Sequence, residues 1–229
     1  MKDVIIACDF SSKNETLEFL NKIKNYKPYI KIGMELFYKE GPDFVRQLKE
    51  KGYKIFLDLK LHDIPNTVYK AMKNIVDLGV EMTNVHAAGG IKMMQAAQKA
   101  IDEKNSSTIL IAVTQLTSIS EDELKNELLI NKSMEETVKT YALNAKKAGI
   151  KGVVCSPLEA GIMSELEMFS VTPGIRFLSN DNDDQVRVTT PKLAKELGSK
   201  YIVVGRSITQ AKEPVKAYEK CIEEFIYEN

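Results

Sequence analysis

The chain has 229 residues, of which 44% are hydrophobic and 28% are charged, as is ordinary for a globular protein with one large core. Its formal net charge is zero, so we expect no binding to nucleic acid or to a membrane surface through broad electrostatic attraction. No apolar run approaches the length of a membrane span, and the first residues lack the pattern of a signal peptide, so we expect a cytoplasmic protein.

Apolar stretches typical of buried strands alternate along the chain with stretches of helical periodicity. The expected strands lie at residues 3–9, 29–33, 54–60, 82–87, 108–116, 152–157, 169–172 and 201–206. The longer helices expected between them lie at residues 38–51, 65–78, 91–102 and 134–148. Ser120 and Glu123 have the spacing of a capping box, so a small helix is also expected after the fifth strand.

The expected strands are apolar on both faces, which is typical of parallel strands buried between two layers. A strand and a helix recur once in roughly 25–30 residues, the length of one βα unit. The eight repeats, with no linker between them, predict an α/β fold in which residues 1–229 form a single domain, a (β/α)8 TIM barrel. A doubly wound parallel sheet is the alternative, and the charged strand ends favour the barrel.

Charged side chains gather where the third expected strand ends. Asp58, Lys60 and Asp63 follow one another closely, and side chains two apart in a strand point to the same side. Asp9 and Lys31 belong to the first and second expected strands, and the carboxyl ends of barrel strands meet on one face. We therefore expect Lys31, Asp58, Lys60 and Asp63 to form a cluster in which opposite charges keep one another ionised. The alternative is a structural ion-pair network, with Asp63 stabilising the N-terminus of the next helix. Asp9 is expected on the same face, with a strand-end turn residue as the alternative.

The seventh and eighth expected strands are each followed by glycine and arginine. The two segments are Pro-Gly-Ile-Arg at 173–176 and Gly-Arg-Ser at 205–207. Glycine lets backbone N–H groups approach an anion closely, and arginine adds a fork of charged donors. Barrels often bind phosphate with the loops after these two strands, which favours a phosphate site. The alternative is that the glycines serve only to form turns and the arginines pair with acidic residues at the surface.

Other polar residues give weaker signals. The three cysteines are widely spaced and form no C-x-x-C pair, and no spacing of His, Cys and carboxylate residues resembles a metal site. Neither of the glycine-rich phosphate-binding motifs occurs. We expect His62 to lie in a loop and His86, at the end of the fourth strand, to form a hydrogen bond with a neighbouring loop, and neither is expected to have a catalytic role.

The segment 58–67 reads Asp-Leu-Lys-Leu-His-Asp-Ile-Pro-Asn-Thr. It resembles the D-x-K-x-x-D-I-P-N-T signature of the orotidine 5′-phosphate decarboxylase family in its bacterial form. Other segments resemble those of the family in the same order along the chain. They are Ala-Cys-Asp at 7–9, Lys-Ile-Gly at 31–33, Gln-Leu-Thr-Ser at 115–118, Thr-Pro-Gly-Ile-Arg at 172–176, Asp-Gln-Val-Arg-Val-Thr-Thr-Pro at 184–191 and Val-Gly-Arg-Ser-Ile-Thr at 204–209.

The resemblance implies loss of CO2 from orotidine 5′-phosphate to give UMP, the last step of pyrimidine synthesis, with no metal or organic cofactor. It implies that Lys60 stabilises the carbanion and supplies the replacing proton, with Asp58 and Asp63 holding the lysine charged and oriented. It also implies a homodimer, in which Asp63 and Thr67 reach into the site of the neighbouring subunit.

Contacts with the substrate are implied in the same way. Asp9 and Lys31 would contact the ribose hydroxyls, and Thr117 and Ser118 would lie at the pyrimidine. The phosphate would be held by the segments that contain Pro173, Arg176, Gln185, Gly205 and Arg206. The lid segment at 179–183 lacks the glycines expected there, which leaves the dynamics of a lid at 177–190 open.

Two other functions remain as alternatives. The first is a magnesium-dependent sugar-phosphate decarboxylase or aldolase related to hexulose phosphate synthase, which this chain resembles at Asp9, Asp58 and Lys60. Those enzymes carry an acid at the position of Lys31, where a lysine should repel a divalent ion. The second is a non-catalytic nucleotide-binding barrel, against which Lys60 with its two neighbouring acids argues.

Overall fold

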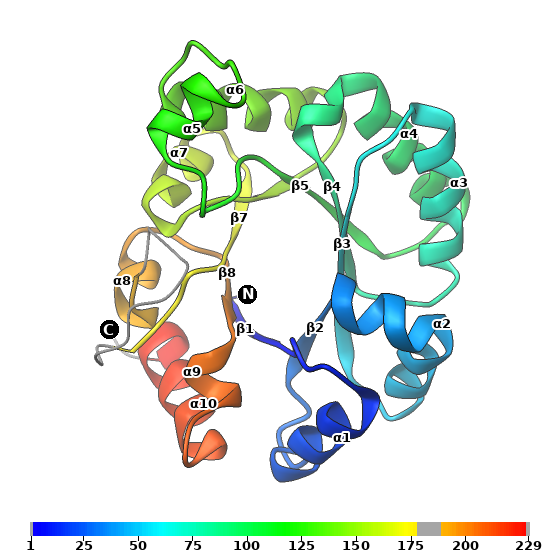
Figure 1. The fold of residues 1–229 in the computed structure, drawn as a ribbon, viewed down its shortest axis with the longest axis vertical. Helices are drawn as coiled ribbons and strands as arrows, with labels where there is room; N and C mark the ends of the chain where they lie inside the picture. The colour runs from blue at the N-terminus through cyan, green and yellow to red at the C-terminus, as the bar shows by residue number, and fades with distance from the viewer. Residues whose placement is uncertain (1, 178–188, 228–229) are drawn as a thin grey trace.

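The computed structural model describes residues 2–177 and 189–227. All strand pairs are parallel, and the strands close into a barrel in chain order, with the last strand beside the first (Figure 1). The predicted (β/α)8 barrel is therefore confirmed, and the doubly wound sheet is wrong because this sheet has no open edge. The strands are β1 (Asp3–Ala7), β2 (Tyr29–Gly33), β3 (Lys54–Leu61), β4 (Met82–His86), β5 (Ile109–Val113), β6 (Gly152–Val154), β7 (Phe169–Thr172) and β8 (Tyr201–Val204).

Helices surround the barrel on its outside (Figure 1). The longer ones are α1 (Lys13–Lys22), α2 (Met34–Glu50), α3 (Pro65–Val76), α4 (Gly90–Glu103), α6 (Met134–Lys147) and α10 (Pro214–Ile222). Short ones are α5 (Glu121–Asn126), α7 (Ala160–Glu165), α8 (Pro191–Glu196) and α9 (Arg206–Thr209). Single turns form η1 (Ala87–Gly89) and η2 (Pro157–Glu159), and a π-helical segment, η3 (Glu223–Tyr227), follows α10. None of the helices in the described ranges is long and apolar enough to cross a membrane.

The start of α2 differs from the expected one. The helix begins at Met34 rather than at Tyr38, and it is interrupted at Gly41, whose φ is 72°. Pro42 follows directly, and proline disfavours helical backbone at the residue before it. Glycine adopts a positive φ without steric cost, so the chain breaks and resumes as a helix at this point. The capping box at Ser120 and Glu123 is confirmed at the start of α5.

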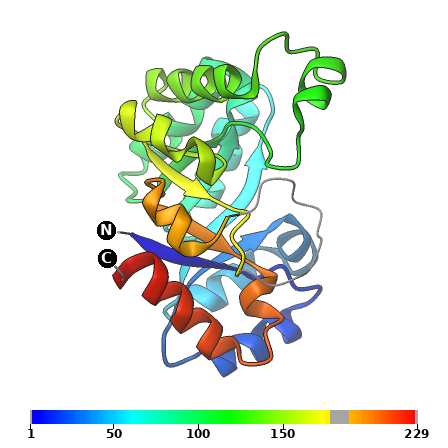
Figure 2. The same ribbon diagram turned by 90° about the vertical axis from the view of Figure 1, so that its left-hand side faces the viewer.

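Hydrophobic side chains fill two layers because successive residues of each strand point to opposite faces. Those that point inward fill the barrel, and they are Ile5, Ala7, Tyr29, Phe56, Met82, Ile111, Val171 and Val203. Those that point outward pack beneath the helices, as Val4, Ile6 and Ile30 do. Because the barrel interior is filled with side chains, a site for binding or catalysis can form only at the ends of the strands. Figure 2 shows the carboxyl ends on the side from which the green segment holding α5 stands out.

Candidate active site

A cavity of about 560 Å³ opens at the carboxyl ends of the strands. Much of its apolar lining comes from six strands, through Ala7, Phe56, Val113, Val154, Val171 and Val203. Sites for small molecules occupy roughly 300–1,000 Å³ and combine apolar walls with a few polar groups. This cavity therefore has the volume and the apolar lining of a site for one small molecule.

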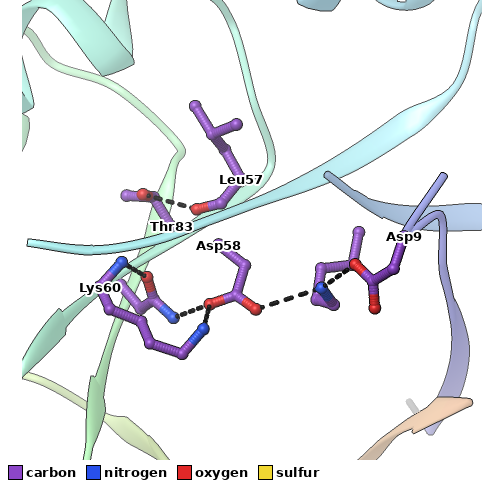
Figure 3. A network of polar contacts seen from close by, with 7 residues as sticks. Asp9, Leu57, Asp58, Lys60 and Thr83 are labelled. Carbon is purple, nitrogen blue, oxygen red and sulfur yellow. Dashed lines mark hydrogen bonds and ion pairs between the residues drawn. The ribbon is translucent and has the colours of Figure 1, made fainter. Parts of the chain in front are cut away.

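Four charged side chains from the first three βα units form a continuous row along the cavity wall (Figure 3). Lys31 Nζ lies 2.8 Å from Asp9 Oδ1 and 3.3 Å from Asp58 Oδ2. Lys60 Nζ lies 2.7 Å from the other carboxylate oxygen, Asp58 Oδ1. The strand register explains this arrangement. Gly33 of β2 pairs with Asp58 of β3, and Lys31 lies two residues before Gly33, so its side chain points to the same face of the sheet. The expected grouping of these four side chains is therefore observed.

The side chains of the row keep one another ionised through electrostatic attraction. Burial raises the pKa of Asp58, but the ammonium groups of Lys31 and Lys60 outweigh that effect and bring the pKa below its usual value. Burial likewise lowers the pKa of Lys31, and Asp58 and Asp9 outweigh it, so that the net shift is upward. Asp58 and Lys31 are therefore both ionised at neutral pH, and the cavity wall presents fixed charges of alternating sign.

Glycines and arginines after β7 and β8 form another part of the wall. Gly174, Arg176, Gly205 and Arg206 line the cavity, together with the expected Pro173. The backbone of the loop after β7 is tied to the segment before α8, since Arg176 N donates to the carbonyl of residue 189 at 2.9 Å. Gly174 has a φ of 79°, which a residue with a side chain rarely adopts. These loops place cationic groups and backbone donors at the same cavity as the charged row.

The comparisons with known proteins agree with this geometry. The model of the orotidine 5′-phosphate decarboxylase / HUMPS family matches residues 2–221. The chain belongs to this family. It is 54% identical over 225 residues to the orotidine 5′-phosphate decarboxylases of Bacillus cytotoxicus and Bacillus mycoides, covering 95% of this chain and 94% of each relative. The structure of orotidine 5′-phosphate decarboxylase from Lactobacillus acidophilus has a TM-score of 0.89 and 43% identity, covering 99% of this chain and 100% of that one.

The remaining residues expected from the family resemblance fall into three groups. Thr117 and Ser118 line the cavity, as does the neighbouring Gln115. Asp63 and Thr67 do not line it, although both belong to the family signature segment. Gln185 lies outside the residues that the structure describes.

Asp63 is exposed and lies outside the cavity lining that contains the row of charges. Its Oδ1 accepts a hydrogen bond from the backbone N–H of Ile64 at 2.6 Å. It borders a shallow depression with His62 and Gly89, and no ion pair links it to Lys60 in the described part of the chain. Within this chain, the expected acid–cation–acid arrangement thus reduces to Asp58 and Lys60.

The two histidines lie beside each other, with ring centroids 5.7 Å apart. Burial, followed by the neighbouring His62 and Lys60, lowers the pKa of His86. His86 is therefore neutral at physiological pH. Across residues 2–177 and 189–227, no three His, Cys, Asp or Glu side chains are grouped so that they could hold a metal ion.

Sequence reasoning missed one polar residue next to the row of charges. Asn84 of β4 is completely buried, and its side chain bonds to both Asp58 and Lys60. A usable signal was present, because an amide in the middle of an otherwise apolar strand requires buried hydrogen-bond partners. Gln210, at the end of α9, also lines the cavity and was not expected.

Proposed function

We propose that the protein removes CO2 from orotidine 5′-phosphate to give UMP, with Lys60 as the residue that stabilises the carbanion and supplies the proton. The observation that carries the proposal is the 2.7 Å ion pair of Lys60 and Asp58 in the same cavity as the two arginine-containing loops. The relatives named orotidine 5′-phosphate decarboxylase support it, because they match this chain over nearly its whole length.

The chemistry requires a positive charge at the reacting carbon. When the bond from pyrimidine C6 to the carboxylate breaks, CO2 leaves and the electron pair stays on C6. An ammonium in a water-poor pocket stabilises that charge because it is already oriented before the reaction begins. Lys60 then donates a proton to C6 and is reprotonated from solvent, so that atoms and charges balance. Asp58 keeps Lys60 oriented, and the apolar floor excludes water.

The other polar groups bind the parts of the substrate that do not react. In this proposal Asp9 and Lys31 contact the ribose hydroxyls, and Thr117 and Ser118 contact the pyrimidine. The phosphate is held by the loops after β7 and β8, which contain Pro173, Arg176, Gly205 and Arg206, and by Gln185. Binding energy from the phosphate can contribute to transition-state stabilisation at a distance from the reacting carbon.

A metal-dependent reaction of a sugar phosphate is the competing proposal within the same family. A divalent ion would be held between the acids at the ends of β1 and β3. In this chain the ammonium of Lys31 lies between them, 2.8 Å from Asp9 and 3.3 Å from Asp58. A second cation at that place would meet strong repulsion. The charge arrangement therefore favours the reaction that needs no metal or organic cofactor.

A homodimer completes the proposal, with Asp63 and Thr67 entering the site of the partner subunit. Their exposure in this chain supports it, and so does the neighbouring Ile64, an apolar side chain that is 66% exposed. An exposed isoleucine beside polar residues is suited to burial at an interface. The cytoplasm as compartment stays a prediction.

The deciding experiment follows the ultraviolet absorbance of orotidine 5′-phosphate with the purified protein, with and without EDTA. We expect the substrate to be converted to UMP at the same rate in both samples. Turnover of a sugar phosphate that disappears on chelation would instead support the metal-dependent alternative. Tight binding of UMP with unchanged orotidine 5′-phosphate would support a non-catalytic nucleotide-binding barrel.

A further inference from the structure

Asn84 lies at an irregularity in the barrel, between β3 and β4. Leu57 pairs with Thr83, but the next pair joins Leu61 to Val85. Four residues of β3 are therefore matched by two of β4, and the extra length forms a bulge that contains Asp58 and Lys60. Bulges of this kind redirect side chains and interrupt the regular ladder of backbone hydrogen bonds.

The side chain of Asn84 fills the interrupted part of the ladder. Its Oδ1 accepts from the backbone N–H of Lys60 at 2.7 Å, and its Nδ2 donates to Asp58 Oδ1 at 2.7 Å. Reversing the amide would place a donor against the N–H and an acceptor against the carboxylate, so only this orientation satisfies both. Asn84 is 0% exposed, so no bulk water can replace either partner.

The backbone of Lys60 needs such a partner. Its φ is +50°, in the left-handed region that residues with a side chain rarely adopt. Such backbone persists only where the surroundings hold it in place. Asp58 Oδ1 accepts from both Lys60 Nζ and Asn84 Nδ2, so one amide connects the lysine backbone to the carboxylate that binds the lysine head.

We propose that Asn84 is a positioning residue for the decarboxylation, holding the Lys60 backbone and the Asp58 carboxylate in the arrangement that orients the Lys60 ammonium. The inference rests on the proposed function of Lys60. Asn84 does not line the cavity, so it acts through these two residues and leaves the binding groups untouched. Its loss therefore lowers kcat and leaves KM nearly unchanged. The reason is that displacement of a reacting group reduces the stabilisation of the transition state and not the affinity for the substrate.

Thr83 provides the matched control. It precedes Asn84 on β4, is also 0% exposed, and its Oγ1 donates to the carbonyl of Leu57 at 3.0 Å (Figure 3). Thr83→Val thus removes one buried hydrogen bond between the same two strands without touching Lys60 or Asp58. A merely structural role for Asn84 predicts similar kinetics for Asn84→Ala and Thr83→Val once both are folded.

The experiment measures kcat, KM, UMP affinity and melting temperature for wild type, Asn84→Ala, Asn84→Asp and Thr83→Val. We expect Asn84→Ala to lower kcat by at least about tenfold, with KM and UMP affinity within about twofold of wild type. Asn84→Asp keeps the shape and the acceptor for the Lys60 N–H but sets a second carboxyl group against Asp58, so that the two either repel or share a proton that Asp58 otherwise lacks. It should therefore also lose at least about tenfold in kcat. Thr83→Val should stay within about twofold of wild type.

Hydrogen exchange at the Lys60 amide gives a readout that does not depend on turnover. Asn84→Ala should accelerate that exchange, whereas Asn84→Asp and Thr83→Val should leave it protected. Failure of wild type to convert orotidine 5′-phosphate would refute the proposed function, and amide exchange would then decide the positioning role alone. If wild type is active and Asn84→Ala retains the kcat of Thr83→Val, or if its Lys60 amide stays protected, Asn84 is not a positioning residue.

Discussion

Lys60 and Asp58 form an ion pair of 2.7 Å even though Lys60 has left the strand conformation, with a φ of +50°. In a regular strand these side chains would stand side by side without specifically meeting. The bulge turns the lysine so that its head folds back onto the carboxylate, which leaves the ammonium in a defined place at the cavity wall. The proposed decarboxylation depends on this pair.

Replacement of Lys60 by alanine should remove nearly all turnover while UMP still binds. The reason is that the cavity then has no cation beside the reacting carbon, although the phosphate loops are intact. Steady-state absorbance measurements should show kcat below about a tenth of wild type, a barrier increase of at least about 1.4 kcal/mol. Lys24→Ala, at an exposed lysine distant from the cavity lining, is the control. A Lys60→Ala enzyme with more than that residual rate would contradict the assigned role.

Replacement of Arg206 by alanine should raise KM and lower kcat/KM for orotidine 5′-phosphate, because a charged donor to the phosphate is lost. Orotidine without the phosphate should react equally slowly with both proteins. Arg46→Ala is a matched control, since Arg46 is an arginine of α2 paired with Asp43 outside the cavity lining. Equal losses on both substrates would show that Arg206 does not act through the phosphate.

Lys31→Ala should make the reaction more sensitive to acid. Burial raises the pKa of Asp58, and the charge of Lys31 is the largest single cause that opposes it, so removal of Lys31 moves that pKa upward. The carboxylate that orients Lys60 is then protonated at a higher pH, and the acid limb of the kcat profile should shift upward. Lys54→Ala, on the same strand as Asp58 but at its other end, should leave the profile in place. An unshifted limb in Lys31→Ala would show that this charge does not control Asp58.

Mixing two inactive variants should restore activity if Asp63 serves the partner site. In a dimer of one Lys60→Ala and one Asp63→Ala subunit, one of the two sites has both native residues. Random exchange of subunits makes about half of the dimers mixed, so about a quarter of wild-type activity should return. A mixture of Lys60→Ala with Asp58→Ala is the control, because both residues belong to one subunit's site. No recovery in the first mixture would place Asp63 outside the partner site.

His86 should make the folded state less stable as the pH falls. Burial lowers its pKa below the ordinary 6.5, so the unfolded chain binds a proton more readily than the folded one. The stability due to neutral His86 is complete above the unfolded pKa and is lost as the pH falls toward the folded value. Melting temperatures between about pH 8 and pH 5 should therefore fall less steeply in His86→Gln than in wild type. Parallel curves for the two proteins would contradict the assignment.

Sequence periodicity was sufficient for the barrel because parallel buried strands and intervening helices leave a strong pattern. It also placed Lys31, Asp58 and Lys60 together, since strand ends converge on one face. The bulge in β3 was not predictable, because it arises from pairing with β4, and the positive φ of Lys60 follows from that pairing. Assigning Asn84 required the same pairing, whereas its unusual place in an apolar strand was visible beforehand.

Asp63 shows the limit of reasoning from one chain. Spacing grouped it with Asp58 and Lys60, but it lies beyond the strand and bonds to the backbone of Ile64. The family resemblance implies a role across a subunit boundary, which the mixing of the Lys60→Ala and Asp63→Ala variants tests. The break of α2 at Gly41 is a different case, since the glycine and the proline after it were visible in the sequence, and the helix expected at 38–51 ran across both.

The position of Lys31 between Asp9 and Asp58 has a consequence for how this part of the cavity wall acquires its positive charge. Where a metal ion supplies the positive charge between two acidic side chains, the folded chain must first bind that ion. Here the cation is encoded in the polypeptide and arrives when β2 pairs with its neighbours. The charge at this place is set by translation and folding alone, so a cell short of divalent ions would still produce it in full.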